Sequence, residues 1–371
     1  MAEPLKNHFG PAIPRNIAAM ITAVHPRFRA DTFLKEALQG YQTLALLPRG
    51  WHIARTLRRY LPADYPQAVE ILIASLGPKL AQTDSLGMAP FLYLPHVLLI
   101  AEHGLGHFEP SMRAQYELTQ RFTAEFSIRP FLAHHPAPTL ARLKLWTGDP
   151  SAHVRRLVSE GTRSRLPWAP RLRAFQEDPR PVLALLESLK DDPALYVRRS
   201  VANNLNDIGK DHPDLLAATA RRWMNNASEE RRWLVRHGLR SAVKRGETAA
   251  LDILGFSGTA RATIDSVAIT PRRARIGDRL AIAFDLTNTG PRRQALLVDF
   301  RIHFVKANGK SSAKVFKLKT VELAPRATVR LSKNVSLREM TTRKHYSGRH
   351  QVDVVLNGQV QPLGSFELMK T

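Results

Sequence analysis

The chain of 371 residues contains no cysteine and carries 55 Lys and Arg against 32 Asp and Glu, a formal net charge of +23 at pH 7. The missing cysteines exclude disulfides, iron–sulfur clusters, thiolate zinc sites and a thiol nucleophile, and they suit a reducing compartment. The positive charge predicts a polyanionic partner, with nucleic acid ahead of an anionic membrane surface.

Neither a secretory leader nor a membrane span is predicted. Residues 1–16 lack an apolar run, and no stretch approaches the roughly 20 apolar residues that cross a bilayer. We therefore expect a cytoplasmic protein with no membrane association.

Helices are predicted up to about residue 255. In this part apolar residues recur at spacings of three and four, Pro and Asp-Pro interrupt the pattern, and β-branched runs are few. The clearest helical patterns cover residues 31–41, 65–77, 111–126, 181–190 and 215–224. We expect one helical domain over residues 1–255.

The pattern changes to short strands after residue 260. Apolar and polar residues alternate between Gly, Asn and Pro, most clearly over residues 266–271, 279–290, 296–311, 314–337 and 350–358. A length of about 110 residues matches an immunoglobulin-like β-sandwich, which we place at residues 260–371. Because residues 261–371 hold 21 Lys and Arg against 8 Asp and Glu, we expect this domain to contact the polyanion.

One stretch of the helical part is repeated. The sequence DPSAHVRRLV at residue 149 returns as DPALYVRRSV at residue 192, and a weaker third copy begins at Asn226. Asp before Pro suits a helix start, and the valines then face the neighbouring repeat. The pattern is typical of HEAT-like repeats, which stack into a solenoid with a concave face. The predicted fold class is thus mainly α, a helical-repeat solenoid followed by a small all-β sandwich.

The first copy carries the clearest candidate residues. Arg156, Glu160 and Arg163 lie on its polar face, and the second copy has Asn203 in the place of Glu160. Arg156 and Glu160 are either an ordinary i, i+4 surface pair worth about 0.3–0.5 kcal/mol, or part of a site. Trp168 follows in a turn with a proline on each side, and is either a contact residue or a plug for the helix end.

A second carboxylate, Glu125, lies between Phe122 and Phe126 and is either a helix-surface residue paired with Arg121 or Arg129, or part of the same site. Motifs of other chemistries are missing. The sequence has no phosphate-binding loop, no convincing dinucleotide fingerprint, no nucleophile elbow and no metal-ligand spacing. We therefore expect no metal, no ATP or NAD, and no other cofactor.

Four segments carry a resemblance to a known family: PFLYLPH (90–96), SMRAQYELTQRFTAEFSIRPFL (111–132), HVRRLVSEGTRSRLPWAP (153–170) and YVRRSVANNLNDIGKDHP (196–213). Together they resemble the AlkC-type DNA glycosylases of the AlkC/AlkD superfamily, and the likeness covers most of residues 30–250. The C-terminal domain resembles one that some members of this family carry. Ser164 stands where a proline of the family is expected.

The resemblance implies residue roles and a function. Position by position, the catalytic carboxylate of the family falls on Glu160, the supporting carboxylate on Glu125, the aromatic contact on Trp168 and a basic partner on Arg156. Together with the polar face of the repeats, it places DNA contacts at Arg156, Arg163, Arg165, Arg199, Asn203, Asn206 and Lys210.

The expected activity is excision of positively charged alkylated bases from double-stranded DNA without base flipping. The expected bases are 3-methyladenine, 3-methylcytosine and 7-methylguanine, and the enzyme is expected to be a monomer. One carboxylate would stabilise an oxocarbenium-like transition state. Two alternative functions would also explain the net positive charge: a nucleic-acid-binding HEAT-repeat scaffold without activity, and a scaffold for acidic protein partners.

Overall fold

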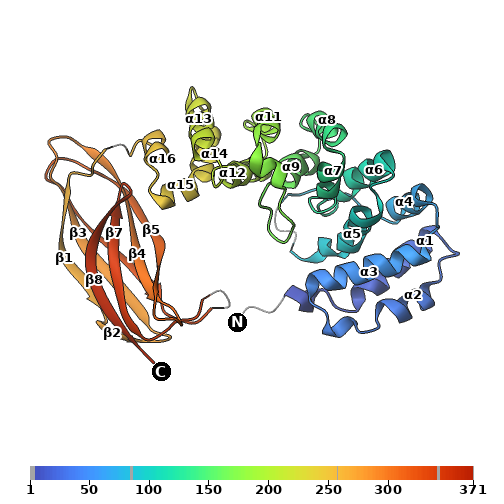
Figure 1. The fold of residues 1–371 in the computed structure, drawn as a ribbon, viewed down its shortest axis with the longest axis horizontal. Coiled ribbons are helices and arrows are strands. Elements are labelled where there is room, and N and C mark those ends of the chain that lie inside the picture. The colour runs from blue at the N-terminus through green and yellow to red at the C-terminus, as the bar shows by residue number, and fades with distance from the viewer. Residues whose placement is uncertain (1–4, 84–86, 257, 341–342, 371) are drawn as a thin grey trace. The chain divides into compact units, whose positions relative to one another are not determined.

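The chain forms two compact units in a computed structural model that describes residues 5–83, 87–256, 258–340 and 343–370 (Figure 1). The first unit comprises residues Met1–His212 and Ala227–Gly238, and the second comprises Pro213–Asn226 and Leu239–Thr371. Within the described residues there are sixteen α-helices, three 3-10 helices and eight strands.

The first unit is helical throughout. Its elements are η1 (Leu5–His8), α1 (Ala12–Val24), α2 (Ala30–Ala37), η2 (Tyr41–Thr43), α3 (Leu46–Tyr60), α4 (Tyr65–Ala74), η3 (Ala89–Tyr93), α5 (Leu94–His103), α6 (Phe108–Thr119), α7 (Ile128–His134), α8 (Pro136–Trp146), α9 (Ala152–Gly161), α10 (Arg173–Glu177), α11 (Arg180–Leu189), α12 (Leu195–Ile208) and α14 (Glu229–Gly238).

The repeated sequence produces a repeated local structure. The carboxylate of Asp149 accepts a hydrogen bond from the amide of Ser151 at 2.8 Å before α9, and Asp192 accepts one from Ala194 at 2.9 Å before α12. Helix α12 packs between α9 and α14. Arg155 of the first copy also binds the carboxylate of Asp192 at 2.6 Å, so the repeated Asp joins one copy to the next.

The apolar face of α9 is buried as its spacing predicts, with Val154, Leu157 and Val158 fully inaccessible. The same face ends in Gly161, where a Cβ would lie only 2.5 Å from Cγ2 of Ile128. Glycine therefore lets the end of α9 approach the start of α7. This close approach positions the polar residues described below.

The second unit combines three helices with a β-sandwich. Its elements are α13 (Pro213–Met224), α15 (Arg240–Arg245), α16 (Thr248–Ile253), β1 (Ala262–Thr270), β2 (Arg273–Arg275), β3 (Arg279–Asn288), β4 (Gln294–Val305), β5 (Ser311–Leu323), β6 (Thr328–Ser336), β7 (Gly348–Leu356) and β8 (Gln359–Met369). The segment from 314 to 337, written as one pattern in the sequence, contains two strands, and β2 and β8 are additions to the predicted set.

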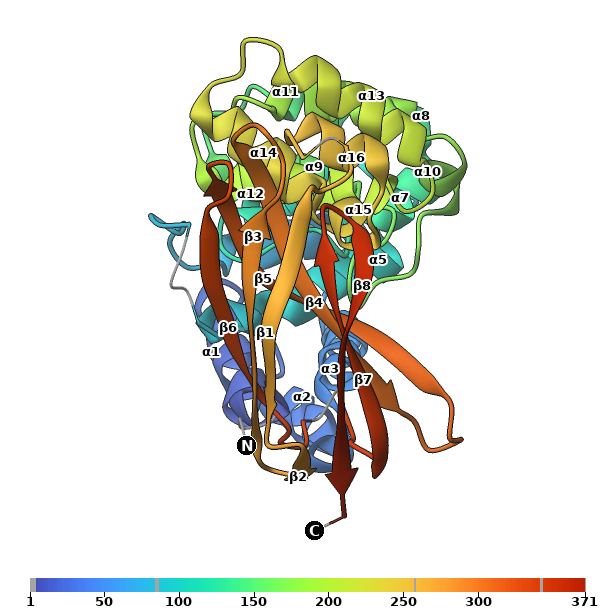
Figure 2. The same cartoon turned by 90° about the vertical axis from the view of Figure 1, so that its left-hand side faces the viewer.

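The strands form two sheets, in the orders β1-β3-β6 and β2-β8-β7-β4-β5 (Figure 2). Every pairing is antiparallel except that of β2 with β8. Strand β3 alternates exposed or partly buried residues with buried ones, as a strand with one face on a core requires. Buried residues from both sheets, such as Ile282, Phe300 and Val352, share one core.

Three outcomes concern the sequence predictions. The helix predicted for residues 111–126 ends at Thr119, so residues 120–126 are a connection. The division at residues 255–260 stays a prediction: the last helix ends at Ile253 and the first strand begins at Ala262, while Pro213–Asn226 and Leu239–Thr371 group together as one unit. Among the described residues, no helix is both long and apolar enough to cross a bilayer.

Candidate active site

A cavity of about 370 Å³ in the first unit brings the two predicted carboxylates together. The connection between α6 and α7, helix α9, the segment after α9 and the first turn of α12 all contribute to its wall. The lining residues that matter below are Thr123, Glu125, Phe126, Arg156, Glu160, Arg163, Trp168 and Tyr196.

Glu160 is buried, with 5% of its surface exposed, and each of its oxygens has a partner. Arg163 donates to Oε1 at 2.6 Å, and the second guanidinium nitrogen of Arg156 lies 3.6 Å from the same atom. Ser200 donates from Oγ to Oε2 at 2.5 Å. Glu160 is thus held from both sides, which a wet i, i+4 surface pair would not be.

The charge state of Glu160 follows from these partners. Burial raises the pKa of this carboxyl, but the charges of Arg156 and Arg163 and the hydrogen bond from Ser200 outweigh burial and hold the pKa below its ordinary value of 4.5. Glu160 is therefore an anion at neutral pH.

Glu125 lies in a turn before α7 and pairs with Arg156, not with Arg121 or Arg129 as a helix-surface residue would. Its Oε2 accepts from Arg156 at 2.7 Å and from the hydroxyl of Thr123 at 2.8 Å. The early end of α6 causes this difference, because it frees the following residues to turn back towards α9. Arg156 consequently stands between the two carboxylates.

Arg156 is held by charge and by an aromatic ring. Its guanidinium lies over the ring of Tyr196, 5.2 Å from the centroid. Desolvation on burial lowers the pKa of Arg156, but the charges of Glu125 and Glu160 dominate and raise it above the usual value. The guanidinium therefore stays charged, and two anions share it.

A second buried carboxylate extends the network. Asp207 accepts from Nε of Arg163 at 2.8 Å and from Nζ of Lys210 at 2.8 Å. Arg163 is buried and bridges Glu160 to Asp207. Arg165 pairs with Asp211 through a fork of two hydrogen bonds, one of them at 3.0 Å from Nε.

The remaining residues predicted to contact DNA lie on α12, the helix that also carries Ser200 and Asp207. Arg199 is exposed and makes no hydrogen bond or ion pair with the residues that the structure describes. Asn203 is half-buried, and its Oδ1 lies 3.3 Å from Nε2 of His237 on α14. Asn206 is buried. The structure thus brings Glu125, Arg156, Glu160, Arg163 and Trp168 into one cavity, and these three residues are not among those that line it.

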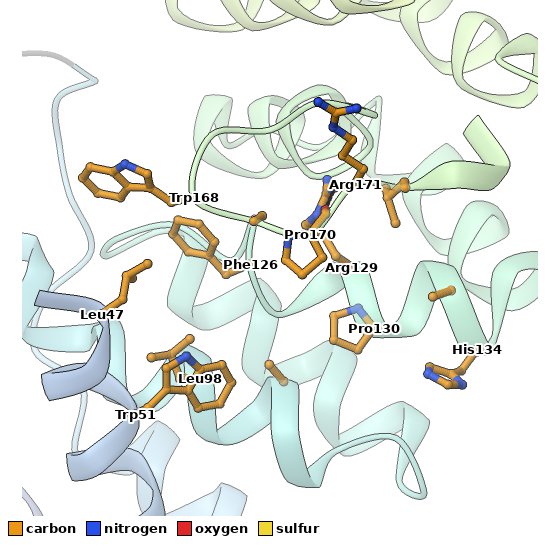
Figure 3. A pocket seen from close by; sticks show the side chains of 14 residues that line it. Leu47, Trp51, Leu98, Phe126, Arg129, Pro130, His134, Trp168, Pro170 and Arg171 are labelled. Carbon is orange, nitrogen blue, oxygen red and sulfur yellow. Dashed lines mark hydrogen bonds between the residues drawn. The ribbon is translucent and has the colours of Figure 1, made fainter. Parts of the chain in front are cut away.

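Trp168 is 55% exposed and has a φ of +64°, a left-handed conformation that is strained for a bulky side chain. Together with Phe126 it lines both the carboxylate cavity and a neighbouring apolar cavity of about 410 Å³. Figure 3 shows Trp168 beside Phe126, with Leu47 and Trp51 of α3 across the apolar cavity. An exposed aromatic ring in a strained turn favours the contact role over the helix plug.

The sequence pattern did not reveal the residues that orient this site. Ser200, Asp207 and Tyr196 all lie on α12, forty or so positions from the side chains they hold. The second copy of the repeat was the available signal, since α12 packs directly against α9. No group of three or more His, Cys, Asp and Glu residues within the described ranges could hold a metal ion.

Comparison with known proteins agrees with this architecture. A family model described as "Uncharacterised protein YhaZ, C-terminal Ig-like domain" matches residues 263–370. The uncharacterized protein YhaZ of Bacillus subtilis strain 168 is 34% identical over 98% of this chain and 99% of its own length. The Pseudomonas fluorescens alkylpurine DNA glycosylase AlkC, solved bound to DNA containing an abasic site analog, is 40% identical, with a TM-score of 0.91 over 99% of this chain and 100% of the other.

The chain belongs to the AlkC family. The similarity extends over both units, since the AlkC alignment spans nearly the whole chain and the C-terminal model matches the β-sandwich. The immunoglobulin-like character predicted for the C-terminal strands is confirmed, and so is the helical fold that precedes it.

Proposed function

We propose that this chain is a DNA glycosylase that hydrolyses the N-glycosidic bond of positively charged alkylated bases in duplex DNA, as the first step of base excision repair. The proposed substrates are 3-methyladenine, 3-methylcytosine and 7-methylguanine. The observation that carries the proposal is Glu160, an ionised carboxylate buried at an open cavity in a chain of the AlkC family. We expect a monomeric cytoplasmic enzyme that needs no cofactor.

The proposed chemistry follows from the charge of the lesion. Alkylation at N3 or N7 makes the base a cation, so it leaves as a neutral molecule with the electron pair of the C1′–N bond and needs no acid. The sugar becomes oxocarbenium-like, and a buried carboxylate stabilises such a cation strongly. Water then adds to C1′ and loses a proton to solvent. Because the pKa of Glu160 is low, its role is charge stabilisation and not proton uptake.

The other residues of the cavity have supporting roles in this proposal. Trp168 offers its exposed ring face to the cationic base through a cation–π contact. Arg156 holds Glu125 and Glu160 in place. On the family likeness, we also propose that the lesion is reached without base flipping, unlike in most glycosylases.

The burial of the polar residues divides the predicted DNA contacts into two groups. Arg163 and Asn206 are buried and Arg156 is paired with two carboxylates, so we assign these three to holding the site. Arg165, Arg199, Asn203 and Lys210 are at least partly exposed, and we propose that they contact the DNA backbone. The basic β-sandwich is proposed to bind the same duplex.

The direct test is release of free base from a duplex that carries a single alkylated base. We expect the wild-type protein to release 3-methyladenine, measured by chromatography of the base and by alkali cleavage at the abasic site. An unmodified duplex of the same sequence is the control. Tight DNA binding without release of any of the three bases would contradict the proposal and favour the binding scaffold.

Base release is expected to be insensitive to pH over the neutral range and to keep its rate down to about pH 5. The folded pKa of Glu160 lies below 4.5, so the carboxylate is lost only as pH falls through that lowered value. The ionised Glu160 also stabilises the fold: this contribution is fully present at pH values above the unfolded pKa and is lost as pH falls through the lower folded pKa. Single-turnover rates between about pH 4 and 8, corrected for spontaneous loss of base, test this.

Ser200→Ala tests whether the ionisation of Glu160 determines the acidic limb of the pH profile. It removes the 2.5 Å hydrogen bond to Oε2 of Glu160 and should move the acidic limb to higher pH. An acidic limb that stays in place would mean that Glu160 does not determine it.

Arg199→Ala is expected to weaken binding of alkylated and unmodified duplexes equally and to lower the slope of log K against log salt concentration by about 0.9. Arg199 is exposed and its charge is available to a phosphate. The control is Arg180→Ala, because the charge of Arg180 is already balanced by Asp178 at 2.7 Å. Equal losses of affinity in the two variants would contradict a specific phosphate contact at Arg199.

A further inference from the structure

One buried arginine near the cavity has no part in the chemistry proposed above. Arg129 lies on α7 and is 4% exposed. Its guanidinium donates to the carbonyl oxygens of Gly161 at 3.1 Å and of Arg163 at 2.7 Å, and to that of Pro170. Gly161 is the last residue of α9, Arg163 and Pro170 belong to the segment that follows it, and Figure 3 shows Arg129 next to Pro170.

The three carbonyls lie at the two ends of one short loop, residues 161–170. Within the loop the amide of Ala169 makes a long hydrogen bond to the carbonyl of Leu166 at 3.4 Å, and the carbonyl of Ser164 accepts from the amide of Leu172 at 3.2 Å. The loop carries Trp168, whose φ of +64° is unfavourable for a tryptophan. A strained residue keeps such a conformation only where its surroundings fix it. The guanidinium of Arg129 holds the backbone on both sides of Trp168, in addition to the ion pairs that Arg163 and Arg165 make with their side chains.

We infer that Arg129 is a positioning residue of base excision, which ties both ends of the loop 161–170 to α7 and so holds Trp168 beside the carboxylates. This inference rests on the proposed function. Arg129 acts through the loop, since its guanidinium contacts carbonyl oxygens and is buried from solvent.

Arginine suits this task better than lysine. A planar guanidinium presents several N–H donors in fixed directions, whereas an ammonium is a point charge on a flexible stem. Burial lowers the pKa of Arg129, to about 10, against a raising effect of Glu125, so the group keeps its charge at neutral pH. A lysine at this position could reach some of the three carbonyls, so it should fix the loop 161–170 only in part.

The chain offers a matched control for a purely structural role. Arg49 is also 4% exposed, and among the described residues its guanidinium donates only to backbone carbonyls, namely those of Lys6, Phe9, Gln42 and Leu44. It lines neither of the two cavities beside Trp168. Loss of Arg49 therefore removes a similar set of contacts without touching the loop.

The experiment compares Arg129→Met, Arg129→Lys and Arg49→Met in the full chain, with single-turnover base release at saturating enzyme and DNA affinity as the readouts. We expect Arg129→Met to slow release about 100-fold with DNA affinity kept, because small misplacements in a catalytic site cost about that much. Arg129→Lys should fall between it and the wild type. Arg49→Met should lose thermal stability but release base at the wild-type rate.

Amide hydrogen exchange gives a readout that does not depend on activity. Peptides covering residues 161–172 should exchange faster in Arg129→Met and, less so, in Arg129→Lys, and should be unchanged in Arg49→Met. If the wild type releases no base, the proposed function fails, while faster exchange still supports the loop contact. Unchanged exchange in both Arg129 variants, or a wild-type rate despite faster exchange, would overturn the inference.

Discussion

Replacing Glu160 by Gln is expected to slow the release of 3-methyladenine by about 10²–10³-fold at saturating enzyme, with DNA binding retained. The substitution keeps the size and shape of the side chain and removes its negative charge. The transition state then loses the anion nearest to the developing cation. The amide group would also turn a donor towards either Arg163 or Ser200, each of which now donates to a carboxylate oxygen.

Glu117→Gln is the matched control for this experiment. Glu117 also pairs with an arginine four residues away, Arg121, at 2.7 Å, but it does not line the carboxylate cavity. Single-turnover rates and DNA dissociation constants of both variants should be measured with the wild type. A wild-type rate in Glu160→Gln, or an equal loss in Glu117→Gln, would rule out a specific role for the charge of Glu160.

Local sequence patterns were sufficient to find the helix that carries Glu160. The Asp-Pro start, the spacing of Val154 and Val158, and the repeat at residue 192 all describe local structure, which depends on neighbouring residues. The structure buries this apolar face as expected. The alternation of strands after residue 260 has the same origin, and it likewise predicts which face meets the core.

The environment of the carboxylates could not be predicted in the same way. Glu125 pairs with Arg156 because α6 ends at Thr119, and the sequence up to Phe126 keeps a helical spacing that conceals this end. Ser200 reaches Glu160 from another helix, 40 residues along the chain. Contacts at such separations depend on packing between helices, which a one-dimensional pattern does not contain.

The polar residues of α12 show the same limit. Asn206 lies on the side of the repeat that carries arginines, yet it is buried, since α12 is covered by α9 and α14. The positive φ of Trp168 was also hidden, because tryptophan gives no local signal for a left-handed conformation. It follows that the sequence was sufficient to choose candidate charged and aromatic residues, whereas packing decides which of these side chains are exposed and able to contact DNA.

Asp207→Asn is expected to destabilise the fold by about 3 kcal/mol, because it removes the anion between two cations at a buried position. Only 2% of the Asp207 side chain is exposed, and its two oxygens accept from Arg163 and Lys210 at 2.8 Å each. Asparagine can accept one of these hydrogen bonds, but its amide group then faces the other cation. The expected loss of stability is near the lower end of the range of about 3–5 kcal/mol for breaking a buried ion pair. The reason is that Arg163 keeps Glu160 as a partner.

Asp211→Asn is the same substitution four residues later, at a less buried ion pair, and it tests whether the loss of stability depends on burial. The Asp211 carboxylate binds Arg165, and both side chains are about one-fifth exposed, at 19% and 23%. Partly exposed pairs contribute less than about 1 kcal/mol, so this variant should unfold close to the wild type. Urea unfolding of both variants gives the difference in free energy. If Asp207→Asn were no worse than Asp211→Asn, Arg163 would not depend on Asp207, and the network from Glu160 to Lys210 would not act as one unit.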